Sequence, residues 1–272
     1  MPTVTEWFIR DTNDEARHVT EWANPGAEWI ALLSHGYGEH IGRYDALAAA
    51  LCKAGAVVLG PDHRGHGRSD GERALIGDFE AVVDDLQSVA RQARRNHPGL
   101  PTVLIGHSMG GMVAGRYGQR YGAELSALVL SGPMFGSREA LVKLSLMNPI
   151  PESPIDPGAL SRDPAVGNAY IEDPLVWHGG LKKPTIQAMI TAMDAVESGP
   201  SLDRLPLLWI HGASDPLVPM AGTRPMIEHL RGDVYEERIY PGAMHEVFNE
   251  TNRDEVIRDV IDFVRKALAR RP

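Results

Sequence analysis

The sequence is short of cysteine and of long apolar runs. Cys52 is its single cysteine, so no disulfide can form within the chain, and nothing in the composition is typical of a disulfide-bonded secreted protein. No apolar run approaches the roughly 18 residues of a membrane-spanning helix. The first residues, MPTVTE, have neither the basic start nor the apolar core of a signal peptide. We therefore expect a cytoplasmic protein without a transmembrane helix.

Positive charge is also in deficit, with 27 Lys and Arg against 36 Asp and Glu and a formal net charge of −9. The basic residues form no long run, which argues against a nucleic-acid partner. The acidic balance also argues against strong attraction to anionic bilayers. Hydrophobic residues make up 43% of the chain, as in ordinary globular proteins. The 272 residues suffice for one α/β domain with a large core.

Short apolar runs alternate with helix-compatible stretches along most of the chain, which is typical of a mostly parallel sheet covered by helices. Two early strands, at 3–10 and 17–22, should form an antiparallel edge. Further strands are expected near Ile30, Val57, Val103, Val129, Leu208 and Arg238. Helices are expected at 44–54, 79–96, 109–121, 221–230 and 253–269. The sequence thus predicts an α/β fold with an eight-stranded, mostly parallel sheet flanked by helices.

The alternation stops between residues 134 and 200, a segment that contains many prolines. A structureless loop of that length is improbable in a compact domain. We interpret 134–200 as a helical cap inserted into a core made of 1–133 and 201–272. Its first part, 139–147, has apolar residues on more than one helical face. Such a helix either packs inside the cap or offers an apolar surface for transient contact with membranes or micelles.

The most informative motif is Gly106-His107-Ser108-Met109-Gly110, a G-x-S-x-G pattern between an apolar run at 102–105 and a helix-compatible stretch. The backbone turns so sharply around such a serine that flanking Cβ atoms would collide, hence the glycines. The turn lifts the hydroxyl off the sheet, and the N–H of Met109 points into the same space. Ser108 is therefore the candidate nucleophile. The alternative is a glycine-rich packing turn.

A serine hydroxyl needs a base, and the base needs an orienting carboxylate. In serine hydrolases with a G-x-S-x-G turn these follow in the order Ser, Asp or Glu, His. Asp215 comes just after the apolar run 205–212, and His245 lies in the loop that follows the strand at 235–240. Three other residues fit less well: Asp203 precedes its strand, His211 should be buried beside the site, and His229 should lie on a helix surface.

The loop after the early strand, Ser34-His35-Gly36-Tyr37-Gly38-Glu39-His40, should supply the second N–H for an oxyanion, and Tyr37 is the best-placed donor. The loop lacks the Gly-Lys-Ser/Thr ending of a phosphate-binding loop, so a nucleotide site is discounted. The segment 62–69 contains two histidines but no further set of ligands, so no metal is expected there. The chemistry requires no cofactor.

Longer motifs extend along nearly the whole chain. They are His35-Gly36-Tyr37-Gly38-Glu39-His40 with Arg43-Tyr44, Asp62-His63-Arg64-Gly65-His66-Gly67-Arg68-Ser69, Leu160-Ser161-Arg162-Asp163-Pro164, Asp173-Pro174-Leu175-Val176, His211-Gly212-Ala213-Ser214-Asp215 and Tyr240-Pro241-Gly242-Ala243-Met244-His245-Glu246-Val247-Phe248-Asn249-Glu250. Together with the serine motif, they resemble the monoacylglycerol lipases of the α/β-hydrolase superfamily.

This resemblance implies a serine hydrolase that cleaves monoacylglycerols to fatty acid and glycerol, with a lipid ester as its partner. It implies Ser108, Asp215 and His245 as the triad, the N–H groups of Tyr37 and Met109 as oxyanion donors, and Glu39 and Arg43 at the glycerol end of the pocket. A broader carboxylesterase or lysophospholipase remains an alternative. A ligand-binding protein of the same fold that hydrolyses nothing is another. The oligomeric state stays open.

Overall fold

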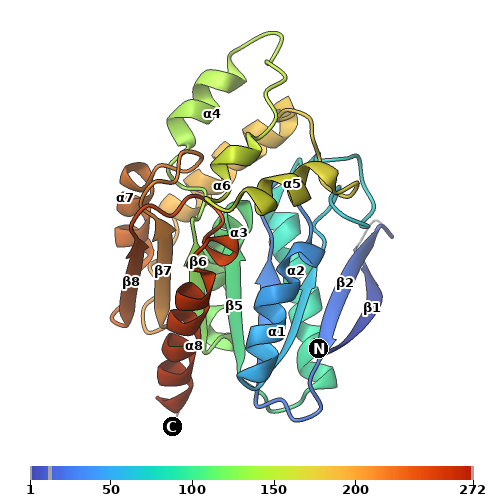
Figure 1. Cartoon of the computed structure of the whole chain (residues 1–272), viewed down its shortest axis with the longest axis vertical. Helices are drawn as coiled ribbons and strands as arrows, with labels where there is room; N and C mark the ends of the chain where they lie inside the picture. Colours follow the sequence, from blue (N-terminus) through green and yellow to red (C-terminus); the bar gives the residue numbers. More distant parts are fainter. Residues whose placement is uncertain (1, 12–13, 271–272) are drawn as a thin grey trace.

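The computed structural model describes residues 2–11 and 14–270, and its centre is an eight-stranded sheet (Figure 1). Its strands are β1 (Thr3–Arg10), β2 (Ala16–Ala23), β3 (Trp29–Ser34), β4 (Ala56–Pro61), β5 (Thr102–His107), β6 (Ala127–Ser131), β7 (Leu207–Gly212) and β8 (Tyr235–Tyr240). They lie in the order β1-β2-β4-β3-β5-β6-β7-β8. The β1–β2 and β2–β4 pairs are antiparallel and the others parallel. The predicted sheet is confirmed.

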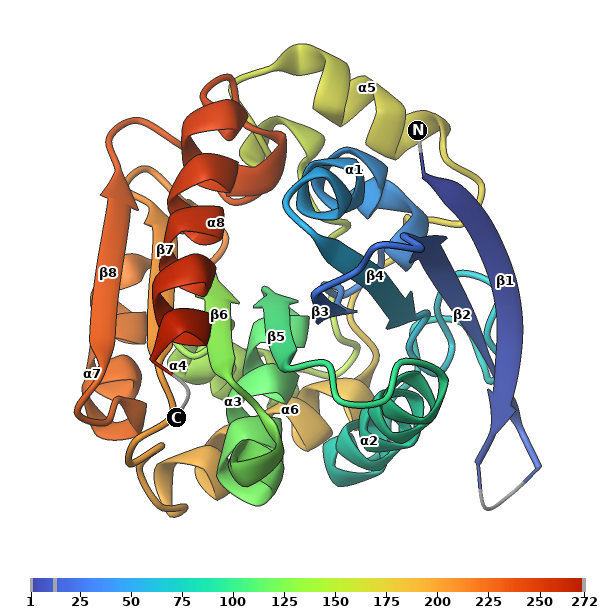
Figure 2. The ribbon, with the colours of Figure 1, turned by 90° about the horizontal axis from the view of Figure 1, so that it is seen from below.

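Helices cover both faces of the sheet, as Figure 2 shows. The helices α1 (Asp45–Lys53) and α8 (Arg253–Ala269) pack on one face, and α2 (Phe79–Asn96), α3 (Met109–Tyr121) and α7 (Met220–Leu230) pack on the other. In β7, Leu207 and Trp209 contribute to the core on the second face, while Leu208 and Ile210 contribute to the core on the first. Because successive strand residues point to opposite faces and both faces are covered, the inner strands β3 to β7 are fully buried and largely apolar, whereas the edge strand β8 is charged and only partly buried.

The strand register places the loops that hold the candidate site residues at one edge of the sheet. Ser34, the last residue of β3, pairs with Gly106 of β5, and His107 pairs with Ser131 of β6. Gly212, at the end of β7, pairs with Tyr240 of β8. The carboxyl ends of five parallel strands therefore lie side by side, at the edge where open α/β sheets bind their ligands.

The cap segment lies across this edge, between β6 and β7 (Figure 1). It contains α4 (Arg138–Ser145), the short 3₁₀ helix η3 (Pro157–Ala159), α5 (Pro164–Glu172) and α6 (Lys183–Glu197). Helix α6 is part of the core cluster through Ile186, Met189 and Met193, which are fully buried. The inserted segment is therefore seated partly on the body of the domain.

The stretch 139–147 combines both of its expected features. Leu141 of α4 is buried, whereas Leu146 and Met147, just beyond the helix, are 80% and 46% exposed. One face of the stretch thus packs inward while its end presents apolar side chains to the outside. Within residues 2–11 and 14–270, no helix is both long and apolar enough to cross a membrane.

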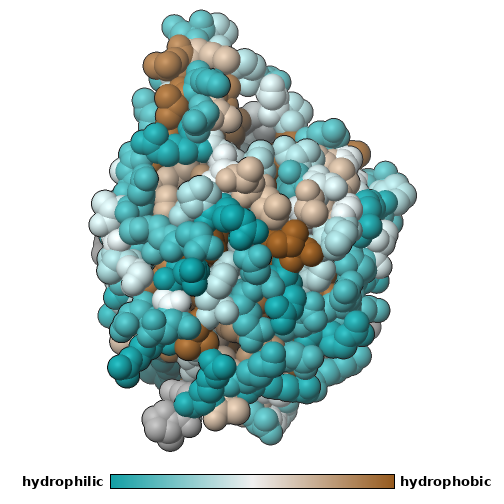
Figure 3. All heavy atoms as spheres, turned by 90° about the vertical axis from the view of Figure 1, so that its left-hand side faces the viewer, coloured by the Kyte–Doolittle hydropathy of each residue, from teal (hydrophilic) through white to brown (hydrophobic). Residues whose placement is uncertain are grey.

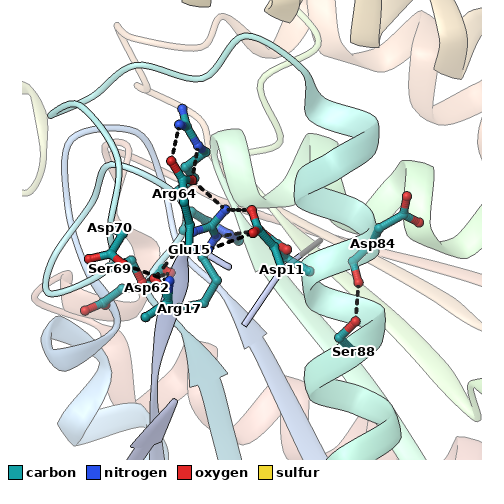
Figure 4. Close-up of polar contacts among 12 residues, drawn as sticks. Asp11, Glu15, Arg17, Asp62, Arg64, Ser69, Asp70, Asp84 and Ser88 are labelled. Atoms are coloured by element: carbon teal, nitrogen blue, oxygen red, sulfur yellow. Dashed lines mark hydrogen bonds and ion pairs between the residues drawn. The ribbon is translucent and has the colours of Figure 1, made fainter. Parts of the chain in front are cut away.

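The β1–β2 hairpin is fastened to the body by a buried arginine (Figure 4). Arg17 of β2 is 1% exposed, and its Nη2 lies 2.6 Å from Asp11 Oδ2 while its Nε lies 2.6 Å from Asp85 Oδ2 on α2. Glu15 lies 3.2 Å from the same Nη2 and also pairs with Arg64 of the loop after β4. One guanidinium thus links the edge hairpin to a helix on the sheet face.

We expect the substitution Arg17→Met to lower the free energy of unfolding by about 3 kcal/mol, because it removes the buried guanidinium and leaves the largely buried carboxylate of Asp85 without its ion-pair partner. Urea denaturation followed by circular dichroism measures this. Arg10→Met is the matched control, since Arg10 and its partner Asp14 are 62% and 84% exposed and such pairs contribute about 0.5 kcal/mol or less. Equal losses in the two variants would contradict the assigned role of Arg17.

Candidate active site

Ser108 lies on the tight turn between β5 and α3, with φ of +55° and ψ of −120°. Positive φ is strained for a residue other than glycine. A Cβ on Gly106 would lie 2.3 Å from the carbonyl oxygen of Gly110, and one on Gly110 would lie 2.1 Å from the carbonyl oxygen of Ser34. Both positions therefore require glycine, and the turn can press against the end of β3.

Asp215 follows β7, His245 follows β8, and the two side chains form a hydrogen bond of 2.8 Å from His245 Nδ1 to Asp215 Oδ2. An ionised carboxylate only accepts, so Nδ1 carries the proton and Nε2 is left as an acceptor. The N–H groups of Leu217 and Val218 donate to Asp215 Oδ1, at 2.9 Å each. This is the tautomer that a general base at Nε2 requires.

The electrostatics of the pair agree with this arrangement. Burial alone would raise the pKa of the Asp215 carboxyl, but hydrogen bonds from His211 and His245 hold that pKa well below its usual range. Burial alone would lower the pKa of His245, but the hydrogen bond and charge of Asp215 outweigh it and raise that pKa above its ordinary 6.5. Asp215 is thus kept ionised beside a histidine that accepts a proton readily.

His211 supports Asp215 from the opposite side. The indole N–H of Trp209 donates to His211 Nδ1 at 3.2 Å, so the proton of His211 is on Nε2. That atom lies 2.9 Å from the carbonyl oxygen of Val218 and 3.2 Å from Asp215 Oδ2. His211 is fully buried, as expected, and both its nitrogens are engaged, so it is not available as the base. His229 is exposed on α7.

The loop 34–40, the candidate oxyanion loop, lies against the candidate nucleophile Ser108. A Cβ on Gly36 would lie 3.2 Å from Ser108 Cβ, and Tyr37 lines the same pocket as Ser108 and His245. Among the described residues, the backbone N–H groups of Tyr37 and Met109 have no acceptor, so both can donate to a substrate oxygen. Within residues 2–11 and 14–270, the side chains of Ser108 and His245 form no hydrogen bond with each other. The hydrogen bond between a nucleophile and its base often forms or shortens only when substrate binds.

The structure brings Glu39 and Arg43 together at the pocket wall. Glu39 Oε1 accepts hydrogen bonds from the N–H of Gly36 at 2.6 Å and from the Tyr44 hydroxyl at 2.7 Å. Arg43 donates to Glu39 Oε2 at 2.8 Å and to both oxygens of Glu246 at 2.6 and 2.9 Å. Glu39 therefore fixes the candidate oxyanion loop, and Arg43 links that loop to the loop of the candidate base.

Sequence reasoning gave no role to Glu246, although it follows His245 directly. Glu246 is 5% exposed, and burial alone would raise its pKa, but the charge of Arg43 and its hydrogen bonds lower that pKa overall. The signal in the sequence is the position of a glutamate directly beside a candidate catalytic histidine. A glutamate buried there needs a cation as partner, and only the fold identifies that cation as Arg43.

Ser108, His245 and Tyr37 line a cavity of about 1010 Å³, a volume that includes its open mouth. Charged and polar side chains form part of its wall: Glu39, Arg43, His107 and Glu246. The rest is mostly apolar and comes largely from the cap segment: Met134, Leu141, Leu144, Ile155, Leu181 and Met189. A pocket with a few polar groups in a largely apolar lining suits a ligand with a small polar end and a hydrocarbon chain.

The raised pKa of His245 predicts the pH dependence of hydrolysis. Only neutral His245 can accept the proton of Ser108, so kcat/KM should fall as pH drops through an apparent pKa above 6.5. Asp215→Asn should move this acid limb to lower pH and reduce kcat by about 10⁴-fold, because the imidazole adopts the wrong tautomer. Initial rates on a soluble ester between pH 5 and 9 measure both.

The control for this profile is His97→Gln, which removes another histidine paired with a carboxylate, Glu21 at 3.2 Å, outside the pocket. That variant should keep the wild-type profile. An acid limb that stays in place in Asp215→Asn would show that Asp215 does not set the pKa of the base.

Comparison with known proteins agrees with this geometry. The family described as "Serine aminopeptidase, S33" matches residues 26–252. A monoacylglycerol lipase of Mycolicibacterium smegmatis is 38% identical over 244 residues, covering 86% of this chain and 87% of the relative. The human monoglyceride lipase is 33% identical over 231 residues, covering 81% of this chain and 76% of the relative.

A solved structure is also similar. The crystal structure of Paleococcus ferrophilus monoacylglycerol lipase superposes with a TM-score of 0.79 at 26% sequence identity, covering 92% of this chain and 99% of the other. The family match spans most of the chain, and the two relatives match over most of both lengths. The chain therefore belongs to the monoacylglycerol lipase family of the α/β-hydrolase superfamily and is a carboxylic ester hydrolase.

Proposed function

We propose that the protein hydrolyses monoacylglycerols to fatty acid and glycerol, with Ser108, His245 and Asp215 as its triad. The observation that carries the proposal is the pocket itself, which joins Ser108 and His245 to a charged wall and a larger apolar wall. A monoacylglycerol has the same division, with a glycerol headgroup on one side of its ester and one acyl chain on the other. The identity of 38% to a monoacylglycerol lipase supports the same substrate.

The reaction proceeds through an acyl-enzyme. Ser108 Oγ attacks the ester carbonyl while His245 Nε2 takes its proton, and Asp215 stabilises the imidazolium that forms. The N–H groups of Tyr37 and Met109 donate to the oxyanion, and one such donor is commonly worth about 3 kcal/mol. His245 then protonates the departing glycerol, which frees the acyl-serine for attack by water. The same steps with water as the nucleophile release the fatty acid.

The charged wall favours a small polar leaving group. Glu39 and Arg43 would lie beside the glycerol hydroxyls, with Arg43 held in place by Glu246. A diacylglycerol leaving group carries two more acyl chains, which would need further apolar surface at about 0.8 kcal/mol per CH₂. The charged part of the pocket does not supply such a surface. The proposal therefore favours monoacylglycerols over triacylglycerols.

The description of the matching family suggests aminopeptidase activity as another candidate function. Such an enzyme has to bind the α-ammonium group of its substrate, which calls for an available carboxylate. The acidic side chains of the described pocket wall, Glu39 and Glu246, both already pair with Arg43. The geometry therefore favours an uncharged ester. A carboxylesterase or lysophospholipase remains the alternative on the same triad.

Initial rates on emulsified mono-, di- and trioleoylglycerol at matched ester concentration test the substrate. We expect the rate on monooleoylglycerol to exceed that on trioleoylglycerol at least tenfold, because the diacylglycerol leaving group has two acyl chains for which the charged wall offers no apolar surface. Comparable rates would show an open groove and overturn the preference. Faster hydrolysis of a lysophospholipid or of short p-nitrophenyl esters would favour the alternatives.

Ser108→Ala is the control for the reaction class. It should lose activity by at least about 10⁴-fold and escape labelling by a fluorophosphonate probe, because it removes only the nucleophilic hydroxyl. Its circular-dichroism spectrum should equal that of the wild type. A wild-type protein that the probe does not label would point to a binding protein without hydrolysis.

We further propose that the cap makes transient contact with lipid surfaces through Leu146 and Met147. These are 80% and 46% exposed, and apolar residues gather at the top of the molecule in Figure 3. Leu146→Asp should lower the rate on emulsified monooleoylglycerol several-fold, because a charge opposes insertion, and leave p-nitrophenyl butyrate hydrolysis unchanged. Val4→Asp, at a 49% exposed site on the edge strand, is the matched control. Equal effects of both variants on the emulsion would contradict docking through the cap.

A further inference from the structure

Two sequence motifs of the cap have no role in the chemistry, and they flank helix α5 on either side. The first is Ser161-Arg162-Asp163-Pro164, at the start of the helix, and the second is Asp173-Pro174-Leu175-Val176, just after its end. In the structure each motif contacts a different catalytic loop. The helix between them therefore connects two parts of the active site that lie far apart in the sequence.

At the start of α5, Arg162 binds the loop of the candidate base. Its Nε lies 2.9 Å from Glu250 Oε2, and its backbone N–H donates to Glu250 Oε1 at 3.1 Å. Glu250 is 1% exposed and also accepts the N–H of Met244 at 2.8 Å, directly before His245. The N–H of Glu246, directly after His245, donates to the carbonyl of Leu160 at 2.7 Å. His245 is thus held on both sides by the segment that leads into α5.

At the other end, Asp173 binds the oxyanion loop. Asp173 Oδ2 accepts a hydrogen bond of 2.7 Å from His40 Nε2, since Nδ1 of that ring accepts the N–H of Gly42. The backbone N–H of Trp177 donates to the carbonyl oxygen of Gly38 at 2.7 Å. Gly38 directly follows Tyr37, the candidate oxyanion donor, and His40 lies two residues further on. The segment that leaves α5 therefore holds the loop that supplies this N–H.

Helix α5 has a well-defined start and a rigid backbone between its two ends. Asp163 caps it by accepting the N–H of Ala165 at 3.0 Å, and Pro164 occupies its first position. Its nine residues span about 13 Å at about 1.5 Å per residue. Tyr170, on its inner side, is 3% exposed and lies under the guanidinium of Arg43, whose Cζ is 5.1 Å from the ring centroid.

The two loops leave strands that are not neighbours in the sheet, because β5, β6 and β7 lie between β3 and β8. We propose that α5 is a strut that sets the separation between the loop carrying His245 and the loop carrying Tyr37, with Arg162 and Asp173 as positioning residues at its ends. The proposal rests on the proposed hydrolysis, in which base and oxyanion donor must reach one ester together. A misplacement of about 1 Å in such a pair costs about 10²-fold in rate.

A double-mutant cycle on the two ends tests the strut. Arg162→Met removes the guanidinium. Asp173→Asn leaves one acceptor oxygen where the carboxylate had two, so it cannot accept from both the His40 N–H and the backbone N–H of Leu175. Each should lower kcat on p-nitrophenyl butyrate about tenfold with KM within twofold, because the short ester needs little of the cap wall. The double variant should also lose only about tenfold, since a strut sets the separation only while the side-chain contacts at both ends hold, and losing the second contact then adds nothing. Independent sites this far apart would instead multiply their losses.

Two further variants separate positioning from stability. Arg162→Lys keeps the charge and should stay within threefold of the wild type. Arg138→Met removes another ion pair of the cap, of 2.6 Å to Asp194, which joins α4 to α6 and contacts neither catalytic loop. It should leave kcat unchanged. The rate of fluorophosphonate labelling, measured alongside, should follow kcat in every variant.

A hundredfold loss in the double variant would overturn the strut in favour of two independent anchors. Unchanged kcat in Arg162→Met, or an equal loss in Arg138→Met, would overturn it as well. If Arg162→Met does not fold, Arg162→Gln takes its place in the cycle. A wild-type protein that neither hydrolyses esters nor reacts with the probe overturns the proposed function, whereas an active wild type with normal variants overturns only the strut.

Discussion

The backbone of Ser108 is the constraint on which the rest of the site depends. A residue at φ of +55° is held there from several sides: its N–H donates to the carbonyl of Ser131, and its own carbonyl accepts the N–H groups of Gly111, Met112 and Met134. These bonds compensate a strained conformation. They also fix the candidate nucleophile to β6 and α3 at once. The glycines beside it let β3 approach closely, and so the loop after β3 comes within reach of the same substrate.

The site buries much charge, and backbone N–H groups make that arrangement stable. Asp215 receives two such groups on one oxygen, and Glu39 receives the N–H of Gly36. A buried carboxylate is costly unless it is paired and hydrogen-bonded. Here each bond that satisfies a carboxylate also orders a loop of the candidate site. Arg43 completes the pattern, because it neutralises Glu39 and Glu246 and thereby joins the candidate oxyanion loop to the loop of His245.

The sequence predicted what depends on local pattern. Strands buried on both faces are short apolar runs, so the inner strands and the loops holding Ser108 and Asp215 could be located from the sequence, and His245 from its place after the last strand. Pairings across the fold could not. That Glu250 would bind Arg162, or that Asp85 would meet Arg17, depends on which segments the fold brings together. The stretch 139–147 shows the same limit: its apolar residues are visible in the sequence, but the burial of Leu141 and the exposure of Leu146 follow from packing on α6.

The origin of the pocket walls explains why one fold can serve many esters. The charged wall comes from loops of the core, where Glu39, Arg43 and Glu246 must keep their geometry because each also orders a loop of the candidate site. The apolar wall comes largely from the cap, whose side chains would contact an acyl chain through dispersion and burial alone. Hydrophobic residues can exchange for others of similar volume at small cost. A change in the cap can therefore alter which acyl chain fits while the charges around Ser108 stay in place.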